Sequence, residues 1–259
     1  MELVGRLERT TWQNGRVTGG VSLGSGDGGS GDGDSADGGR PVEPAPSRFV
    51  MPDPAQAKPG EDLIAIGADL APGTLLAAYR AGIFPMPVEP RRKRSKMAWY
   101  SPDPRGIMPI GGLHVTRSMR KSARRFEIRH DTAFAEVMHR CGDPTRRGRW
   151  ITEEIVTAYD ALYGLGWAHS VEVWRDDRLV GGVYGLLIDR LFAGESMFHL
   201  EIDASKVALM ALVEWLEELG VVLFDVQWTT PHLVSLGAID VPRRTYLRLL
   251  DDAVDRPGQ

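Results

Sequence analysis

The segment from residue 168 to residue 228 restricts the possible folds of this 259-residue chain more than any other part. It begins with three runs of strand length: AHSVEVW (168–174), which alternates apolar and polar residues, LVGGVYGLLI (179–188) and LFAGESMF (191–198). Only the short polar links RDDR and DR separate these runs. This spacing predicts a three-stranded antiparallel meander with two tight turns.

A helix and one further strand follow the meander. SKVALMALVEWLEEL (205–219) carries apolar residues along a broad helical face and stops before Gly220, which suits the position after a helix. VVLFDVQW (221–228) is the further strand. A meander, a helix and another strand predict a layered α/β (α+β) fold. Within the meander, Gly181 and Gly182 indicate a bulge or a close backbone approach.

Further helices are predicted upstream, over residues 72–81, 116–125, 131–140 and 152–165. Pro72 suits the first turn of the first of these helices, and Gly82 suits the position just past its end. The last helix is predicted to start at Thr152, a residue that caps helix N-termini well.

Composition divides the chain into four parts. Residues 1–47 are predicted to be a disordered tail, because residues 19–39 contain ten Gly and four Asp and offer almost nothing to bury. Residues 48–100, punctuated by Pro and Gly, are predicted to form a small N-terminal domain. We expect a larger mixed domain over residues 101–252 and a short C-terminal tail over residues 253–259.

Charge and composition restrict the class of protein. The net charge is −4, yet residues 79–125 contain 12 Lys or Arg and only 2 Asp or Glu. This asymmetry is expected of a nucleic-acid contact on an otherwise acidic protein, with a solvated surface as the alternative. No apolar run approaches the ~18–20 residues that cross a bilayer, and the first residues lack a signal core. With Cys141 as the single cysteine, we expect a cytoplasmic protein without disulfides.

The basic residues lie in clusters beside aromatic residues. The run RRKRSK (91–96) is followed by Trp99 and Tyr100, and the pair Arg120 and Lys121 lies further along. Such interleaving fits a partner that offers phosphates and unstacked bases.

Two acids and an amide are predicted to project from strands. Strict alternation places Asp225 and Gln227 on one face, so that they project together from the end of the last strand. Glu195 lies in apolar company in the meander. Carboxylates on an apolar sheet predict a polar site, unless each one ends at the solvent edge or pairs with an arginine. On spacing alone, we favour the interpretation that each acid ends at the solvent edge or pairs with an arginine.

Several chemistries lack their sequence patterns. The chain has no P-loop motif and no HxxxH spacing among its six His, and GxSxG occurs only within the Gly-rich tail. We therefore predict neither a metal site nor a cofactor.

A set of motifs occurs in the same order as in one known family. They are AIGADLAPGTLLAAYRAGIFP, AWYSPDPR, HVTRSMRK, RWIT, AHSVEVW, LVGGVYG, FAGESMF, DASK, FDVQ and SLGA-x-x-VPR, within residues 48–252. The ordered set closely resembles the leucyl/phenylalanyl-tRNA–protein transferase family. The resemblance implies a small N-terminal domain followed by a GNAT-type acyltransferase-like domain.

The resemblance also implies a reaction. Leu or Phe, and Met less well, would move from the 3′ end of aminoacyl-tRNA to the α-amine of proteins that begin with Arg or Lys, marking them for degradation. The donor ester is already activated, so no cofactor is expected. We expect a monomer, since no dimerising heptads occur.

Site residues follow from the matching motifs. The resemblance implies catalytic roles for Asp225, Gln227 and Glu195, with the first two orienting the amine. The residues it implies for substrate binding are Trp150, Phe192, Met197, Val183, Met86 and Ser196. The residues expected to bind tRNA are Arg91, Arg92, Lys93, Arg94, Lys96, Arg117, Arg120 and Lys121.

The chain departs from the family pattern at four positions. Met86 stands where the family has an aromatic residue after GIFP, which removes a stacking surface beside the terminal adenosine. Tyr100 replaces a Trp, and Val226 replaces a Cys on the opposite strand face. Asp203 replaces an Asn before ASK, and we expect it to cap the following helix.

The same sequence features leave two alternative functions. An acyl-CoA-dependent N-acetyltransferase needs a Gly-rich turn at a helix start, whereas the link HLEIDASK (199–206) contains two acids, Glu201 and Asp203, and no glycine. A non-catalytic tRNA-binding module would need only the basic stretch.

Overall fold

The computed structural model describes residues 12–13, 16–17, 40–89, 95–146 and 150–254. It has two units, residues 1–41 and 42–259. In the first, strand β1 (Trp12–Gln13) pairs antiparallel with β2 (Arg16–Val17). The predicted disorder of the Gly-rich stretch falls on residues outside the described ranges.

The second unit begins with a small antiparallel sheet and one helix. Its elements are the 3-10 helix η1 (Pro54–Gln56), β3 (Leu63–Ile66), α1 (Pro72–Arg80), β4 (Phe84–Pro87) and β5 (Met97–Tyr100). The strand order is β3-β5-β4. Helix α1 confirms the predicted start at Pro72, and Gly82 follows its end with a φ of +78° that suits glycine.

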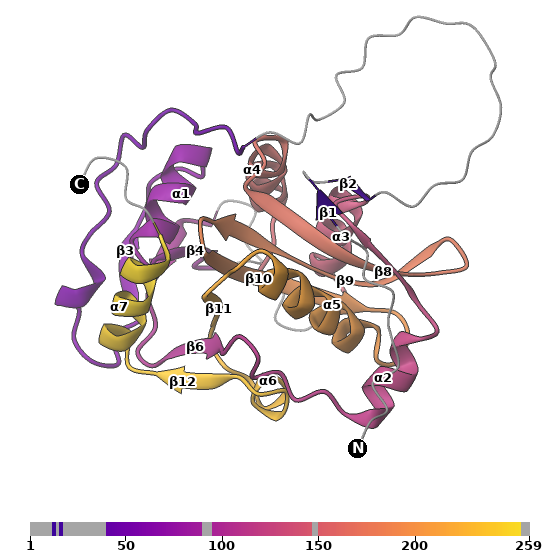
Figure 1. The fold of residues 1–259 in the computed structure, drawn as a ribbon. Helices are drawn as coiled ribbons and strands as arrows, with labels where there is room; N and C mark the ends of the chain where they lie inside the picture. The colour runs from indigo at the N-terminus through magenta and orange to yellow at the C-terminus, as the bar shows by residue number, and fades with distance from the viewer. Residues whose placement is uncertain (1–11, 14–15, 18–39, 90–94, 147–149, 255–259) are drawn as a thin grey trace, which may run out of the picture. The chain divides into compact units, whose positions relative to one another are not determined.

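A seven-stranded sheet forms the centre of the unit (Figure 1). Its strands, in chain order, are β6 (Arg105–Met108), β7 (Glu127–His130), β8 (Ala168–Arg175), β9 (Arg178–Ile188), β10 (Leu191–His199), β11 (Leu223–Gln227) and β12 (Ile239–Val241). Their spatial order is β12-β6-β11-β10-β9-β8-β7.

The predicted meander is confirmed as β8, β9 and β10, which pair antiparallel. Asp176 and Asp177 link the first two strands with φ values of +50° and +56°. Two successive left-handed residues match the twist of a hairpin, and Asp tolerates this conformation. The predicted layered mixed α/β fold is therefore correct.

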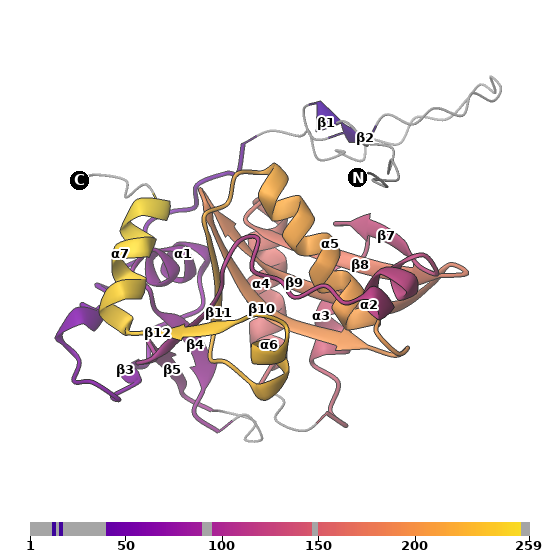
Figure 2. The same ribbon diagram turned by 60° about the horizontal axis from the view of Figure 1, so that its bottom comes forward.

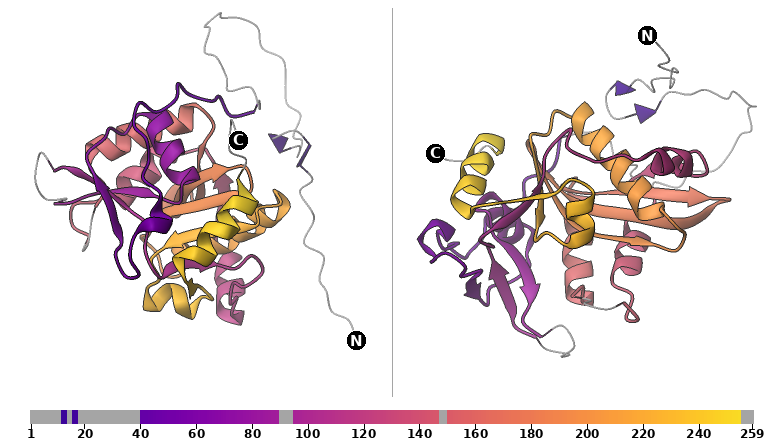
Figure 3. Two further views of the ribbon diagram at one scale, coloured as in Figure 1. Left: turned by 90° about the vertical axis from the view of Figure 1, so that its left-hand side faces the viewer. Right: turned by 90° about the horizontal axis from the view of Figure 1, so that it is seen from below.

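Helices cover both faces of the large sheet (Figures 2 and 3). They are α2 (Arg117–Ala123), α3 (Phe134–Cys141), α4 (Glu153–Gly164), α5 (Ala204–Glu218), α6 (Pro231–Ser235) and α7 (Arg243–Ala253). Helices α5 and α2 lie on one face, whereas α3 and α4 pack on the other. A Cβ on Gly181 would lie 2.7 Å from the Cβ of Ala204, so the predicted close approach is where α5 meets β9.

Strand β11 returns beside β10 in the parallel direction. Their pairing runs only as far as Ala193 and Asp225, although both strands continue beyond it. Each strand has an irregularity at this point, between Gly194 and Ser196 in β10 and between Asp225 and Gln227 in β11. The two strands therefore separate at their carboxyl ends.

The packed unit extends past both boundaries predicted from composition. At its start, Val42 donates its N–H to the carbonyl of Leu165 and accepts from the Trp167 indole. At its end, Ala253 and Val254 are buried in the core. No helix within the described ranges is long and apolar enough to cross a membrane.

Candidate active site

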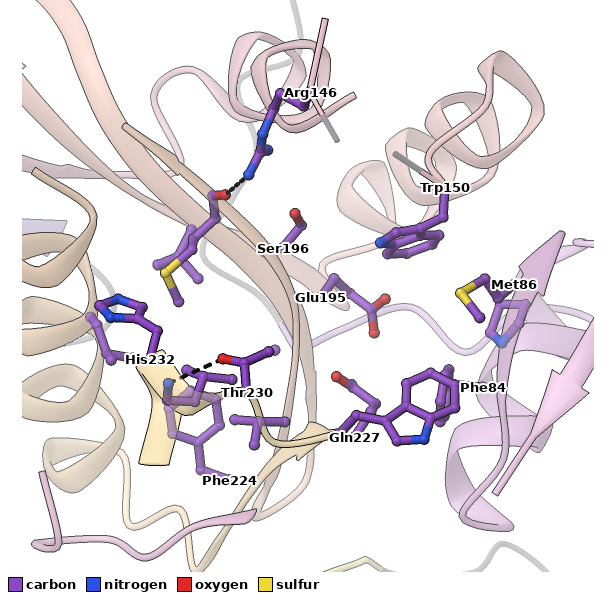
Figure 4. A pocket seen from close by; sticks show the side chains of 18 residues that line it. Phe84, Met86, Arg146, Trp150, Glu195, Ser196, Phe224, Gln227, Thr230 and His232 are labelled. Carbon is purple, nitrogen blue, oxygen red and sulfur yellow. Dashed lines mark hydrogen bonds between the residues drawn. The ribbon is translucent and has the colours of Figure 1, made fainter. Parts of the chain in front are cut away.

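A pocket of about 390 Å³ opens where β10 and β11 separate (Figure 4). Its walls come from β4, β9, β10, α5, β11, α6 and the link between α3 and α4. The lining residues are Phe84, Pro85, Met86, Arg146, Trp150, Val183, Gly194, Glu195, Ser196, Met197, Leu209, Phe224, Val226, Gln227, Trp228, Thr230, His232 and Leu233. A mostly apolar cavity with a few polar groups at the ends of sheet strands is typical of a small-molecule site.

The strand irregularities bring polar groups into this pocket. Because one residue is unpaired at each, neighbouring positions no longer alternate strictly between faces. Glu195 lies at the irregularity of β10, and it lines the pocket together with Ser196 and Met197. Gln227 lies at that of β11 with a φ of +58°, and it also reaches the pocket.

Asp225 does not line the pocket, whereas Gln227 does. The prediction that the two side chains project together from one face of the strand was therefore wrong. Its side chain is fully buried and makes a bidentate ion pair with Arg105, with Nε–Oδ1 at 2.8 Å and Nη2–Oδ2 at 2.6 Å. The hydroxyl of Tyr246 donates to Oδ2, and the backbone N–H of Gln227 donates to Oδ1. Four donors thus occupy the carboxylate. Asp225 does not end at the solvent edge; it pairs with an arginine.

Arg105 is as deeply enclosed as its partner. Its Nη1 donates to the carbonyl of Gly82, and the guanidinium lies over the rings of Tyr246 and Phe84. Burial would lower the pKa of Arg105, but the Asp225 carboxylate outweighs it and leaves this pKa above its ordinary value. Arg105 therefore stays charged, and its contacts tie β6, β11, α7 and the loop after α1 together.

Glu195 has a different environment. The hydroxyl of Tyr79 donates to its Oε1 at 2.6 Å, and the hydroxyl of Tyr159 in turn hydrogen-bonds to Tyr79. Burial raises the pKa of Glu195 to about 8 even though the Tyr79 hydrogen bond acts in the opposite direction. At neutral pH this carboxyl group is mostly protonated, so it can donate a hydrogen bond as well as accept one.

Gln227 offers an unused donor to the pocket. Its Nε2 is buried without a hydrogen-bond partner within the described part of the chain. Figure 4 shows the side chains of Gln227 and Glu195 facing the same space. A buried donor without a partner is costly, and a bound acceptor such as a carbonyl oxygen would satisfy it.

The apolar wall differs in one residue from the prediction. Val183 and Met197 line the pocket as expected. Phe192 does not; its ring lies edge-on to Phe224, with 5.6 Å between centroids, and Phe224 forms the wall instead. The resemblance implied Phe192 at this wall, but Phe224 takes that place.

Aromatic residues form the opposite wall. Trp150 and Met86 both line the pocket, as the resemblance implied, and Figure 4 shows them on the same side of it. Phe84 and Trp228 lie beside them and contact one another edge to face. Tyr100 does not line the pocket, but it packs against Trp228 from behind.

Arg146 is the one Lys or Arg among the described lining residues. It donates from Nη1 to the carbonyl of Cys141 and from Nη2 to the carbonyl of Met197. The guanidinium is thereby fixed at one edge of the pocket (Figure 4). His232 lines the pocket from α6.

The predicted tRNA-binding residues lie on two segments. Arg117, Arg120 and Lys121 are exposed on α2, and Lys96 is exposed just before β5. The remaining four of that prediction, Arg91 to Arg94, lie outside the described residues.

Helix α2 is held to the core by a residue that we expected to act otherwise. Asp203 precedes α5 but makes no side-chain cap, because its φ of +68° turns the carboxylate away. The carboxylate accepts instead from Ser122 of α2 at 2.9 Å and from Lys206 at 3.0 Å. The predicted capping role was therefore wrong, and Asp203 joins the basic helix to the start of α5.

Sequence reasoning missed several residues that shape the site. They are Arg105, Tyr246, Tyr79, Tyr159, Trp228, Arg146 and His232. A buried acid at 225 did signal a basic partner, and the motif SPDPR contains Arg105, but nothing in the spacing joined the two. Within the described residues, no cluster of three or more His, Cys, Asp or Glu could hold a metal ion.

Comparison with known proteins shows the family of the chain. The family model described as leucyl/phenylalanyl-tRNA protein transferase matches residues 107–251, and the model of that family's N-terminal domain matches residues 68–103. The chain belongs to the leucyl/phenylalanyl-tRNA–protein transferase family. It is an aminoacyltransferase, and the two alternatives weighed from the sequence no longer apply.

Individual relatives of the transferase match over most of their length. A protein of Thiobacillus denitrificans named leucyl/phenylalanyl-tRNA–protein transferase is 49% identical over 199 residues, covering 75% of this chain and 86% of that protein. One of the same name from Anaeromyxobacter sp. strain K is 44% identical over 222 residues, covering 84% and 93%. The two family models also support a small N-terminal domain before the main transferase domain. The GNAT-type topology of the latter stays a prediction.

Proposed function

We propose that this transferase moves Leu or Phe, and Met less readily, from the 3′ end of aminoacyl-tRNA to the α-amine of proteins that begin with Arg or Lys. The observation that carries the proposal is the apolar pocket with Glu195 and Gln227 on its wall. Acceptors modified in this way would carry a new apolar N-terminus and be marked for degradation.

The apolar end of the pocket supports the choice of side chain. Val183, Met197, Phe224 and Leu209 form a wall without charge. Burial of an apolar side chain there contributes ~25 cal/mol per Å². The flexible thioether of Met197 can adjust to a branched or a flat side chain, which supports the acceptance of both Leu and Phe.

The reaction itself needs positioning more than activation. The amine nitrogen attacks the ester carbonyl carbon, the C–N bond forms, and the bond from carbon to the ribose oxygen breaks. The amine loses one proton, and the ribose oxygen leaves as a hydroxyl group. Because an α-amine has a pKa of ~7.7–8.0, an appreciable fraction is already neutral at neutral pH.

We assign the polar groups to this chemistry as follows. The amide of Gln227 accepts a hydrogen bond from the amine and donates one from Nε2 to the carbonyl oxygen as charge develops on it. Glu195, held by Tyr79, donates to the substrate in its protonated form. Asp225 contacts no substrate; it is a positioning residue that fixes the backbone of Gln227 through a 2.9 Å hydrogen bond.

The tRNA is bound through its phosphates. Exposed Arg117, Arg120 and Lys121 on α2 support contacts that do not depend on base sequence. We assign Arg91 to Arg94 and Lys96 to the same role from their charge. A tRNA donor places the reaction in the cytoplasm, and we propose that the protein acts there as a monomer.

The test is a transfer assay without ATP. Purified protein is incubated with labelled leucyl-tRNA and peptides that begin with Arg, Lys or Ala and are otherwise identical. Label on the Arg and Lys peptides alone is expected. Label on the Ala peptide to the same extent would overturn the acceptor rule, and no label on any peptide would overturn the proposed reaction. Phenylalanyl-, methionyl- and valyl-tRNA then rank the donors.

A further inference from the structure

Trp228 occupies an unusual place at the pocket. It follows Gln227, whose left-handed φ ends the regular course of β11, and it lines the cavity alongside Trp150 and Met86. Its side chain is neither buried in the core nor fully exposed. A large aromatic side chain that covers the wall of a binding pocket is available to a ligand.

The indole of Trp228 is held in a fixed orientation. Its Nε1 donates to Oδ2 of Asp62 at 3.2 Å. The rings of Phe84 and Tyr100 lie 5.0 Å and 5.7 Å from it, at interplanar angles of 85° and 64°. Among the ring contacts of the described residues, neither neighbour lies flat on the indole. The side chain is therefore oriented in advance, and a flat stacking partner is what it lacks.

The neighbouring residue cannot supply such a surface. Met86 lines the same part of the pocket, but a thioether has no π face on which a base can stack. Trp150 lines the pocket from the link before α4. The pocket thus presents two indoles, those of Trp150 and Trp228, together with the thioether of Met86.

We propose that Trp228 is the stacking platform for the unstacked purine base at the aminoacylated 3′ end of the donor. The inference rests on the proposed function, because it assumes that this end of the tRNA enters the pocket. A single-stranded terminal base binds proteins by stacking on aromatic faces, whatever its identity. In this chain the tryptophan after the D-x-Q strand end performs the role that methionine at position 86 cannot.

The probe is a leucyl-adenosine amide, a stable analogue of the terminal aminoacyl nucleoside, compared with the same leucyl-ribose compound lacking the base. Both are titrated against the wild type, W228F, W228M and W228L. Loss of one base stack weakens binding roughly 5- to 150-fold. We expect W228M and W228L to lose this preference for the base-bearing compound, and W228F to keep most of it.

Two further variants sharpen the test. Trp174 on β8 is also partly buried and lies beneath Arg129, but it does not line the pocket, so W174L serves as the matched control. The double variant M86W/W228M places an indole at position 86 instead of position 228 and is expected to restore the preference. Thermal unfolding of each variant shows whether it is folded. If W228M and W228L both fail to fold, W228F remains as the test. Its smaller ring must then weaken binding of the base-bearing compound and leave binding of the compound without the base unchanged.

The outcomes separate this inference from the proposed function. Retention of the full base preference by W228M, with transfer intact in the wild type, would overturn the role of Trp228 and leave the transferase reaction standing. Base-dependent binding that is lost in W228M, but no transfer by the wild type, would do the reverse. If the wild type binds both compounds equally, the inference is wrong whatever the transfer assay shows.

Discussion

Arg105 and Asp225, which are 120 residues apart in the chain, form a bidentate ion pair with both side chains at most 1% exposed. The pair joins β6 to β11 immediately beside the pocket, and the Asp225 carboxylate also accepts the backbone N–H of Gln227. The residue that best matched a catalytic acid in the sequence is thus enclosed behind the pocket wall. The influence that we propose for Asp225 on the reaction passes through the backbone of Gln227.

Breaking this pair should destabilise the protein strongly. In D225N the Arg105 charge stays buried without a counter-charge, and such changes typically cost about 3–5 kcal/mol. Urea unfolding followed by circular dichroism measures the loss. E127Q, which removes one partner of an exposed ion pair with Arg129, is the control and should hardly change the unfolding free energy. Equal stability of D225N and E127Q would contradict the structural role of Asp225.

Removal of the Gln227 amide should affect the rate more than tRNA binding. We expect kcat to fall roughly 10²–10³-fold in Q227A, as for the loss of one donor to a developing oxyanion, with tRNA affinity unchanged. Gln and Ala both carry a Cβ at this φ of +58°, so Q227A adds no backbone strain, whereas glycine relieves it. Q227G, which also lacks the amide, should be as slow as Q227A, and a fast Q227G would show that the amide does not set the rate.

The transfer rate should fall as pH rises through the pKa of Glu195, which is about 8. Below that pH the carboxyl group is protonated and can donate to the substrate; above it the group is an anion in an apolar pocket. E195Q keeps a donor but cannot ionise, so its profile should lack the high-pH decline. Rates are compared per neutral amine, because the acceptor titrates in the same range. Profiles of the same shape for both proteins would refute the assignment.

The same carboxyl group gives a stability prediction with a definite sign. Its folded-state pKa lies above the unfolded value of ~4.3, so the unfolded state releases its proton first as pH rises. Wild-type stability relative to E195Q should therefore be highest below about pH 4.3 and decline until about pH 8. Thermal unfolding of both proteins across this range tests the sign; a gap that grows with pH in favour of the wild type would contradict it.

Replacement of Arg120 and Lys121 by serine should weaken tRNA binding in a salt-dependent manner. Each lost phosphate contact should reduce the slope of log K against log salt by about 0.7–0.9. The matched control is R244S/R248S on α7, which lies at the other end of the molecule from α2 (Figures 1 and 2). An equal effect of both double variants would show that only net charge matters.

The periodic parts of the fold were predictable because their signals are local. The meander, α4 from Thr152 and α5 before Gly220 follow from alternation, capping and apolar faces within a few residues. The last helix, Arg243–Ala253, was missed. Asp203 shows the limit of local reasoning: its residue type suited a cap, but a partner on α2 decided its role.

For the site, the sequence alone determined which polar residues lie on the two strands that separate: Glu195 on β10, and Asp225 and Gln227 on β11. Only the tertiary structure decided which of them face the pocket. Side-chain direction after an irregular pairing depends on the register of neighbouring strands, and the partner of a buried acid depends on contacts across more than a hundred residues. Asp225 consequently pairs with Arg105, whereas Glu195 and Gln227 line the pocket.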